Sequence, residues 1–203
     1  MKRLFVAIPI SKILQEKALE FQKAYNTLPV IPVAPAAGVA RWLTGKNLHI
    51  TIIPPWYEND PDRIKNILNE FSAQTATTQP NTSPTGPLAI KFNNISYGPN
   101  PAAPRLIWAS GQTPTKLIQF KKNLESLFLK EKILKQQPAC GGPFPFLLHL
   151  TLARFRPEDF KDFPIQNLSE QIDWPETLHT FVLMESHLSS AGADYEILEQ
   201  FKL

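Results

Sequence analysis

Several features that mark common classes of protein are scarce in this chain of 203 residues. Its one cysteine, Cys140, cannot form an intrachain disulfide, which favours a reducing cytoplasm over a secreted setting. Its Pro-Ala-Cys-Gly-Gly context indicates a loop thiol rather than a nucleophile. No apolar run is long enough to span a membrane, and residues 4–8, which follow a basic start, are too few for a signal peptide.

Charge of either sign is also modest, with 21 Lys and Arg against 18 Asp and Glu and a net charge of +3. This balance argues against a surface that binds double-stranded nucleic acid, and it is compatible only with local contact to an anion. No glycine-rich loop follows the first apolar segment, so neither a dinucleotide-binding fold nor a P-loop is supported. With 43% hydrophobic residues, we expect one globular domain over 1–203 with a substantial core.

Twenty prolines divide the rest of the chain into segments with clear periodicity. Helices are predicted from Ser11 to about Tyr25, from Asp60-Pro61 and from Thr113-Pro114. Strands are predicted at 3–9, 47–54, 88–97, 105–110 and 147–155, with a closing hairpin formed by 178–188 and 194–202. Loops are predicted at 27–40, 75–87 and 135–145. This order indicates an α+β or α/β sandwich with helices covering sheets.

The most informative feature is a short pattern that occurs twice. His49 and Thr51 flank Ile50 in the first copy, and His149 and Thr151 flank a leucine 100 positions later. Because side chains alternate along a strand, each pattern places its histidine and threonine on one face and its apolar residues on the other. If the two strands lie side by side, two imidazoles and two hydroxyls face one space.

That set of groups suits the opening of a cyclic phosphodiester by water. One histidine can deprotonate the water and the other can protonate the departing alkoxide, since the unperturbed pKa of histidine is about 6.5. The threonine hydroxyls can donate hydrogen bonds to the non-bridging oxygens as charge builds there. A single copy of the pattern is compatible with an ordinary core strand. The second copy favours catalysis by His49 and His149 with Thr51 and Thr151.

The other two histidines, His179 and His187, lie in the predicted closing strands without a threonine two positions on. We interpret them as structural or surface residues. No two of the four histidines have the i, i+4 spacing of a helical zinc site, and no carboxylate or cysteine is grouped with them in a zinc-binding pattern. The sequence therefore predicts no metal site and no cofactor.

Further segments accompany the two patterns over nearly the whole chain. They are Arg3 to Ile8, Arg41-Trp42, Leu48 to Thr51, Pro104 to Ala109, His149 to Arg154, and Leu188-Ser189 with Gly192, Tyr195 and Leu198. Together they resemble the RNA 2′,3′-cyclic phosphodiesterases, also called bacterial 2′-5′ RNA ligases, of the two-histidine phosphoesterase superfamily. The doubled His-x-Thr pattern in this order and at this separation is the specific part of the resemblance.

The resemblance implies an α+β fold of two pseudo-symmetric lobes, each an antiparallel sheet backed by helices, with the active-site cleft between them. It implies hydrolysis of an RNA-terminal 2′,3′-cyclic phosphate to a 2′-phosphomonoester without a metal or cofactor. Apart from the resemblance, we expect a monomer. Reversible 2′-5′ RNA ligation would use the same groups. The implied partner is an RNA 3′ end, or a nucleotide, that bears the cyclic phosphate.

The resemblance also assigns roles to individual residues. His49 would protonate the 3′ leaving oxygen, His149 would activate water, and Thr51 and Thr151 would hold the phosphate. Arg154 would add positive charge to the site, and Phe5 would stack on the base or ribose.

The last two roles have alternatives. By strict alternation Arg154 lies on the opposite face from His149, and it reaches the site only if the strand bulges or twists near Ala153. Otherwise Arg154 is a surface residue. A phenylalanine in the position of Phe5 is more often a core residue than a stacking platform, and Trp42 and Trp108 are interpreted mainly as core.

Two departures from the usual pattern of the family affect the shape of the cleft. Ile53-Pro54-Pro55-Trp56 stands where Phe-Leu-Gly is common, and Leu148 stands where a proline often precedes the histidine.

Because these departures leave the substrate undecided, two other functions remain open. One is a phosphodiesterase for 2′-5′ oligonucleotides or small cyclic nucleotides, and the other is a non-catalytic nucleotide- or RNA-binding module.

Overall fold

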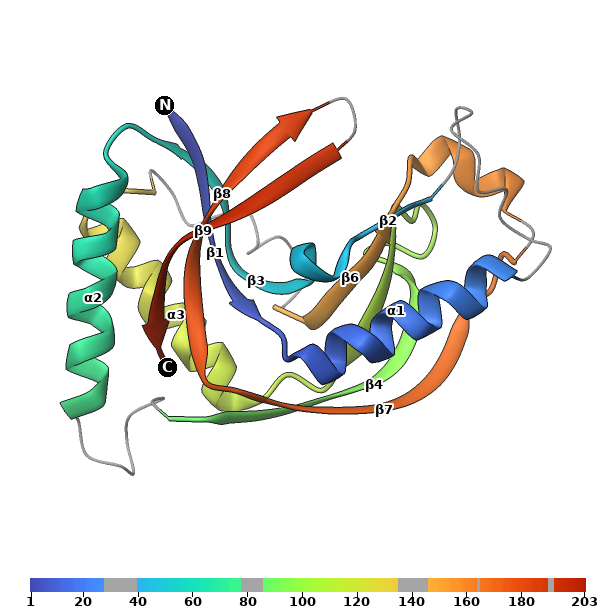
Figure 1. Cartoon of the computed structure of the whole chain (residues 1–203), viewed down its shortest axis with the longest axis horizontal. Helices are drawn as coiled ribbons and strands as arrows, with labels where there is room; N and C mark the ends of the chain where they lie inside the picture. Colours follow the sequence, from blue (N-terminus) through green and yellow to red (C-terminus); the bar gives the residue numbers. More distant parts are fainter. Residues whose placement is uncertain (28–39, 78–85, 135–145, 164, 190–191) are drawn as a thin grey trace.

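The computed structural model describes residues 1–27, 40–77, 86–134, 146–163, 165–189 and 192–203. Two antiparallel sheets dominate it (Figure 1). The first sheet has the order β3-β1-β8-β9, with β1 at Lys2–Pro9, β3 at His49–Glu58, β8 at Thr180–Ser189 and β9 at Gly192–Lys202. The second has the order β2-β6-β5-β4-β7. Its strands are Arg41–Trp42, Leu148–Arg154, Leu106–Gly111, Leu88–Gly98 and Ser169–Leu178, respectively.

Three α-helices flank the sheets: α1 at Lys12–Thr27, α2 at Pro61–Thr77 and α3 at Thr115–Lys130. Two 3-10 helices, η1 at Gly45–Asn47 and η3 at Pro157–Asp162, complete the described elements. Helices α2 and α3 stand beside the first sheet, in contact with β9 and β3, while α1 runs along the second sheet beside β7 (Figure 1). The starts of two helices follow from their capping residues. Ser11 Oγ accepts a hydrogen bond from Leu14 N at 3.2 Å, and Asp60 Oδ1 accepts one from Arg63 N at 3.0 Å.

The two faces of the first sheet are packed differently. Leu4, Val6 and Ile8 of β1 are fully buried in the main hydrophobic core. The alternate side chains of β1 belong to a second, smaller cluster on the opposite face, made by Phe5, Ala7, Val182 and Met184 with Tyr195 packed against them. This smaller cluster lies on the face that carries His49 and Thr51, since Ala7 pairs with Thr51 in the sheet.

The prediction of an α+β fold with two lobes, each an antiparallel sheet, is confirmed. The predicted helices and the predicted strands of both His-x-Thr patterns are also present. The predicted loops 27–40, 75–87 and 135–145 fall largely outside the described residues, as does Cys140. Among the residues that the structure describes, no helix is long and apolar enough to cross a membrane.

The sequence did not predict strand β7. The closing hairpin was predicted to begin at residue 178, whereas β7 already pairs with β4 from Ser169 onward. Only Trp174 and Leu178 of β7 are buried, because β7 is an edge strand with most of its side chains exposed. A strand with so few buried positions lacks the apolar alternation that sequence-based prediction depends on.

Candidate active site

The two strands with the His-x-Thr patterns lie where the two sheets meet. Strand β3 is one of the two edge strands of the first sheet, and β6 is covered on its outer side only by the two-residue strand β2. Strands β3 and β6 contact each other. The structure therefore places the patterns, which are 100 residues apart in the sequence, in contacting strands, which was the condition for one shared site.

Strand β6 changes its alternation directly after Thr151. Ile107 of β5 pairs with Ala153, and the next residue of β5, Trp108, pairs with Thr151. Two residues of β6 thus span one step of β5, which is the geometry of a bulge. Beyond the bulge the faces are exchanged, so Arg154 lies on the same face as His149 and Thr151. This is the irregularity that the sequence required for Arg154 to reach the site.

Strand β3 has the same irregularity at the same place in its pattern. Val6 of β1 pairs with Ile53, and the next residue, Ala7, pairs with Thr51. The face that holds His49 and Thr51 therefore continues at Pro54, which is the counterpart of Arg154. The two halves of the site share a backbone but differ in this side chain.

Both imidazoles are held by a backbone carbonyl two residues upstream. His49 Nδ1 lies 2.8 Å from the carbonyl oxygen of Asn47, and His149 Nδ1 lies 2.9 Å from that of Leu147. A carbonyl oxygen only accepts hydrogen bonds, so Nδ1 carries the proton in each ring. In the neutral ring Nε2 is then the unprotonated nitrogen, available to accept a proton from a ligand.

An aromatic ring from the adjacent strand packs against each imidazole. The ring centroid of Phe5 lies 5.1 Å from that of His49 with an interplanar angle of 45°. Trp108 lies 4.9 Å from His149 at 48°, in the equivalent position. Phe5 is only 2% exposed, which leaves it little surface for stacking on a base and favours its interpretation as a core residue. Trp108 is buried, as the sequence indicated, and it also supports the imidazole of His149.

Tyr195 is a neighbour of His49 that the sequence analysis named only as part of the family resemblance, without a role in the site. Its ring lies 5.1 Å from His49 and 5.0 Å from Phe5, and it is partly exposed. Strand β9 brings it there through two successive strand pairings, β9 with β8 and β8 with β1. Only sheet topology, and no local sequence signal, relates Tyr195 to His49.

The tip of the β8–β9 hairpin connects the two sheets. Asn47 Nδ2 donates a hydrogen bond to the carbonyl of Ala193 at 3.3 Å, and Lys46 pairs with Asp194 at 2.7 Å. Gly192 lies so close to Arg41 of β2 that an added Cβ would be 2.6 Å from Nη1, and its φ of +124° suits glycine. These contacts fix β9, and with it Tyr195, against the segment that precedes His49.

Burial lowers the pKa of both imidazoles. Desolvation is the main cause that lowers the pKa of His49 to about 4, and the charges of Arg154 and His149 lower it further. Desolvation, followed by the charge of Arg154, also lowers the pKa of His149. The carbonyls of Asn47 and Leu147 oppose these shifts. Both rings are therefore neutral at pH 7 before an anion binds.

The two threonines complete the site. Thr51 is partly buried and Thr151 is 8% exposed, and each lies on the same strand face as its histidine. Within the described part of the chain, neither hydroxyl has a hydrogen-bond partner, so both are available to a ligand. Two imidazoles, two hydroxyls and one guanidinium can bind a small oxyanion, and each imidazole can exchange a proton with it through Nε2.

Comparison with known proteins identifies the family of this site. Residues 39–189 match the family model of the 2′-5′ RNA ligase superfamily, which is more than half of the chain. The chain belongs to the 2′-5′ RNA ligase superfamily. The match includes both His-x-Thr patterns, Trp108 and Arg154. No curated protein matches the chain.

Solved structures of this fold cover essentially the whole chain. TT0787 of Thermus thermophilus has a TM-score of 0.71 and 21% identity, covering 99% of this chain and 97% of its own. A structure named a phosphoesterase has a TM-score of 0.67 and 21% identity, covering 100% and 99%. E. coli LigT complexed with 3′-AMP has a TM-score of 0.63 and 20% identity, covering 100% and 98%. At these identities the likeness shows that the fold is the LigT fold.

Proposed function

We propose that this member of the 2′-5′ RNA ligase superfamily is a phosphodiesterase that opens a 2′,3′-cyclic phosphate at an RNA end and leaves a 2′-phosphomonoester. The observation that carries the proposal is the pairing of two equivalent imidazoles on contacting strands, each with its Nδ1 held by a carbonyl and a threonine two positions on. An acid and a base in one site are what this hydrolysis needs.

The chemical step uses one proton transfer on each side of the phosphorus. His149 Nε2 removes a proton from water as the new P–O bond forms. The P–O3′ bond breaks, and His49 Nε2–H protonates the departing 3′ oxygen. The products are a free 3′ hydroxyl and a 2′-phosphomonoester. His149 is then protonated and His49 neutral, and exchange with solvent restores the starting state.

The protonation state required by this step follows from the charge of the substrate. Burial keeps both rings neutral in the free protein. An anionic phosphate beside them favours the imidazolium form of one ring, which takes its proton from solvent. The same burial that lowers the pKa of His49 makes its protonated form a strong donor to the leaving oxygen. The acid role therefore suits the ring whose pKa is lowered to about 4.

Thr51, Thr151 and Arg154 stabilise the charge on the non-bridging oxygens. The hydroxyls donate hydrogen bonds from opposite strands, and the guanidinium supplies the positive charge on the same face. Hydrogen-bond donors fixed before the reaction stabilise developing charge more than mobile water does, and loss of one such donor typically costs about 10²–10³-fold in rate.

The proposed substrate is an RNA 3′ end or a nucleotide in the cytoplasm, as the single cysteine predicted. E. coli LigT, which shares the fold, has been solved with 3′-AMP, ATP and NADP⁺, which favours a nucleotide ligand for this chain as well. RNA is required over DNA because the 2′ oxygen is part of the reacting group. By microscopic reversibility the two histidines would exchange roles in 2′-5′ ligation.

The identity of the product tests this proposal. Adenosine 2′,3′-cyclic phosphate is incubated with the protein in EDTA, and the products are followed by phosphorus NMR. We expect only adenosine 2′-phosphate. Formation of the 3′-phosphate would contradict the assignment of the leaving oxygen. Cleavage of a 2′-5′ dinucleotide without hydrolysis of the cyclic phosphate would favour the 2′-5′ oligonucleotide function, and tight binding without turnover would favour the binding module.

A further inference from the structure

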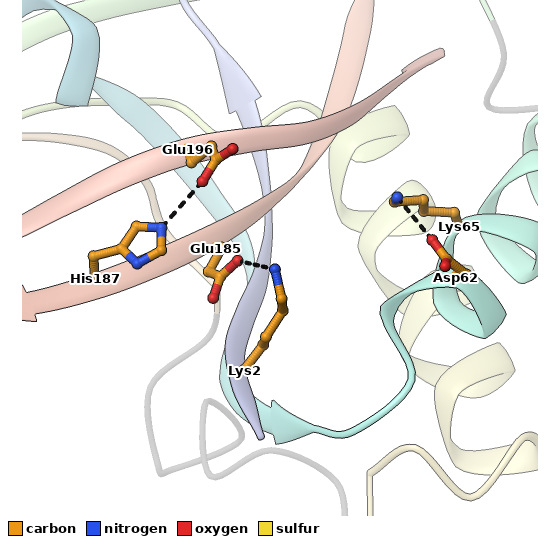
Figure 2. Close-up of polar contacts among 6 residues, drawn as sticks. All are labelled: Lys2, Asp62, Lys65, Glu185, His187 and Glu196. Atoms are coloured by element: carbon orange, nitrogen blue, oxygen red, sulfur yellow. Dashed lines mark hydrogen bonds and ion pairs between the residues drawn. The ribbon is translucent and has the colours of Figure 1, made fainter.

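The β8–β9 hairpin carries a second group of potential ligands on the face opposite Tyr195. Glu185 and His187 of β8 and Glu196 of β9 each have a ligand atom within 4.8 Å of the others (Figure 2). Among the residues that the structure describes, they are the one group of three His, Cys, Asp or Glu side chains able to share a metal ion. None of the three takes part in the proposed hydrolysis.

The pairing of β8 with β9 brings these three side chains together. Glu185 pairs directly with Glu196 across the two strands, and His187 follows Glu185 by two positions, on the same face. His187 Nε2 lies 3.2 Å from a carboxylate oxygen of Glu196. Two ligands bound tetrahedrally to one zinc ion at about 2.0–2.2 Å have donor atoms roughly 3.4 Å apart. The imidazole and this carboxylate are therefore already close to the spacing that a metal ion requires.

The charges on this face favour a cation. Two carboxylates directly opposite each other in a strand pair destabilise the pairing unless their charge is offset. Lys2 pairs with Glu185 at 2.6 Å, whereas the nearby Asp194 pairs with Lys46 at 2.7 Å. Three carboxylates of the hairpin face thus meet two ammonium groups, and the partner of Glu196 is the imidazole of His187.

We propose that Glu185, His187 and Glu196 bind a divalent transition metal ion such as zinc, with water in the remaining position. Imidazole and carboxylate groups are both established ligand types for such ions. The ammonium group of Lys2 competes with the metal ion for Glu185. The Lys2 side chain is 47% exposed and can turn to solvent when the ion binds.

The metal ion would stabilise the hairpin and would not contact the reacting phosphate. Tyr195 directly precedes Glu196, so its side chain lies on the opposite face of β9, where it packs against His49. A bound ion would hold β8 and β9 together beneath Tyr195. The sequence predicted no metal site because Glu196 follows His187 by nine residues and reaches it only through strand pairing.

Isothermal titration with zinc chloride in a non-coordinating buffer tests the site on the full chain. We expect one zinc ion per chain, and we expect His187→Ala and Glu196→Gln each to weaken binding at least tenfold. Lys2→Met should strengthen binding because it removes the competing ammonium. His179→Ala is the matched control, since it removes an exposed imidazole outside the cluster and should leave the affinity unchanged.

The same titration on His49→Ala and His149→Ala separates this site from the catalytic one. Unchanged zinc affinity in both variants supports the hairpin site. Loss of binding in either variant would place the ion at the catalytic imidazoles and overturn the proposal. Retained binding in His187→Ala, or no binding by the unmodified protein, would also overturn it. Glu196→Gln preserves shape, so its far-ultraviolet circular dichroism should match that of the unmodified protein.

Discussion

The two halves of the site differ less in backbone than in charge. His49 and His149 have the same carbonyl anchor, a tilted aromatic neighbour at 5.1 Å or 4.9 Å, and a bulge after the threonine two positions on. The residue that follows the bulge is Pro54 in one half and Arg154 in the other. A repeated local structure thus provides two matched imidazoles, and one side chain outside the repeat makes their surroundings unequal.

The support beneath each imidazole differs as well. His49 packs against Phe5 and Tyr195, and its anchoring residue, Asn47, is 6% exposed. Leu147, which anchors His149, is 42% exposed. The deeper setting of His49 lowers its pKa to about 4 and suits it to donate a proton. The more accessible His149 suits the activation of water arriving from solvent.

The largest expected effect separates the acid from the base. His149→Ala should lower kcat by about 10²–10⁴-fold on any phosphodiester, because the general base is lost. His49→Ala should show a similar loss on a cyclic phosphate but little loss on a diester that releases 4-nitrophenolate, which leaves without protonation. Steady-state rates on both substrates provide the measurement. Equal losses of the two variants on the activated diester would contradict the assigned roles.

Removal of Arg154 tests the charge that distinguishes the halves. Arg154→Gln should lower kcat/KM by roughly 10–10³-fold, because one group that stabilises the phosphate charge is lost. Arg156→Gln, two residues further on and exposed, is the control and should change the rate little. An equal effect of both substitutions would indicate only a general attraction of the anion.

The pH dependence of kcat/KM follows from the lowered pKa values of the free protein. The active form of the pair His49 and His149 holds one proton. This proton is lost, and kcat/KM falls, as the pH rises through the higher of the two apparent pKa values of the pair. We expect that value below 6.5 because the pKa values of both imidazoles are lowered. Activity should also fall near pH 4, where the second imidazole gains a proton. In Arg154→Gln both limbs should move to higher pH, since the positive charge that lowers both pKa values is absent. Unmoved limbs would show that Arg154 does not act on the pair.

The smallest expected effect concerns the support of His149 alone. Trp108 Nε1 donates a hydrogen bond to Ser96 Oγ at 3.1 Å. Ser96→Ala should lower the free energy of unfolding by about 1 kcal/mol, measured by urea titration, because one partly buried hydrogen bond is lost. The apparent pKa of His49, followed by NMR, should not change. A shift at His49 equal to that at His149 would show that the halves are not independent.

Periodicity within single strands predicted much of this site. The alternation of His49 and Thr51 with apolar residues, and of His149 and Thr151 likewise, predicts both faces correctly. The bulge that turns Arg154 to the same face depends on the register between β5 and β6, which no local pattern encodes. The sequence could therefore show that Arg154 needs a bulge to reach the face of His149, but it could not show that the bulge is present.

Residues that reach the site through sheet order could not be predicted. Tyr195 lies beside His49 because β8 pairs with both β1 and β9, and Glu196 meets His187 for the same reason. Strand β7 was missed because its exposed edge position leaves few buried residues to form a pattern. Contacts between distant strands depend on topology, whereas alternation depends only on neighbours in the chain.

One measurement tests the central claim most directly: the turnover of adenosine 2′,3′-cyclic phosphate in EDTA. It compares the unmodified protein with His49→Ala, His149→Ala and His179→Ala. The claim is that two equivalent imidazoles on contacting strands form one acid-base pair. It predicts full activity in the unmodified protein and in His179→Ala, and at least a hundredfold loss of kcat in each of the other two variants. Hydrolysis that survives in either His49→Ala or His149→Ala would contradict it.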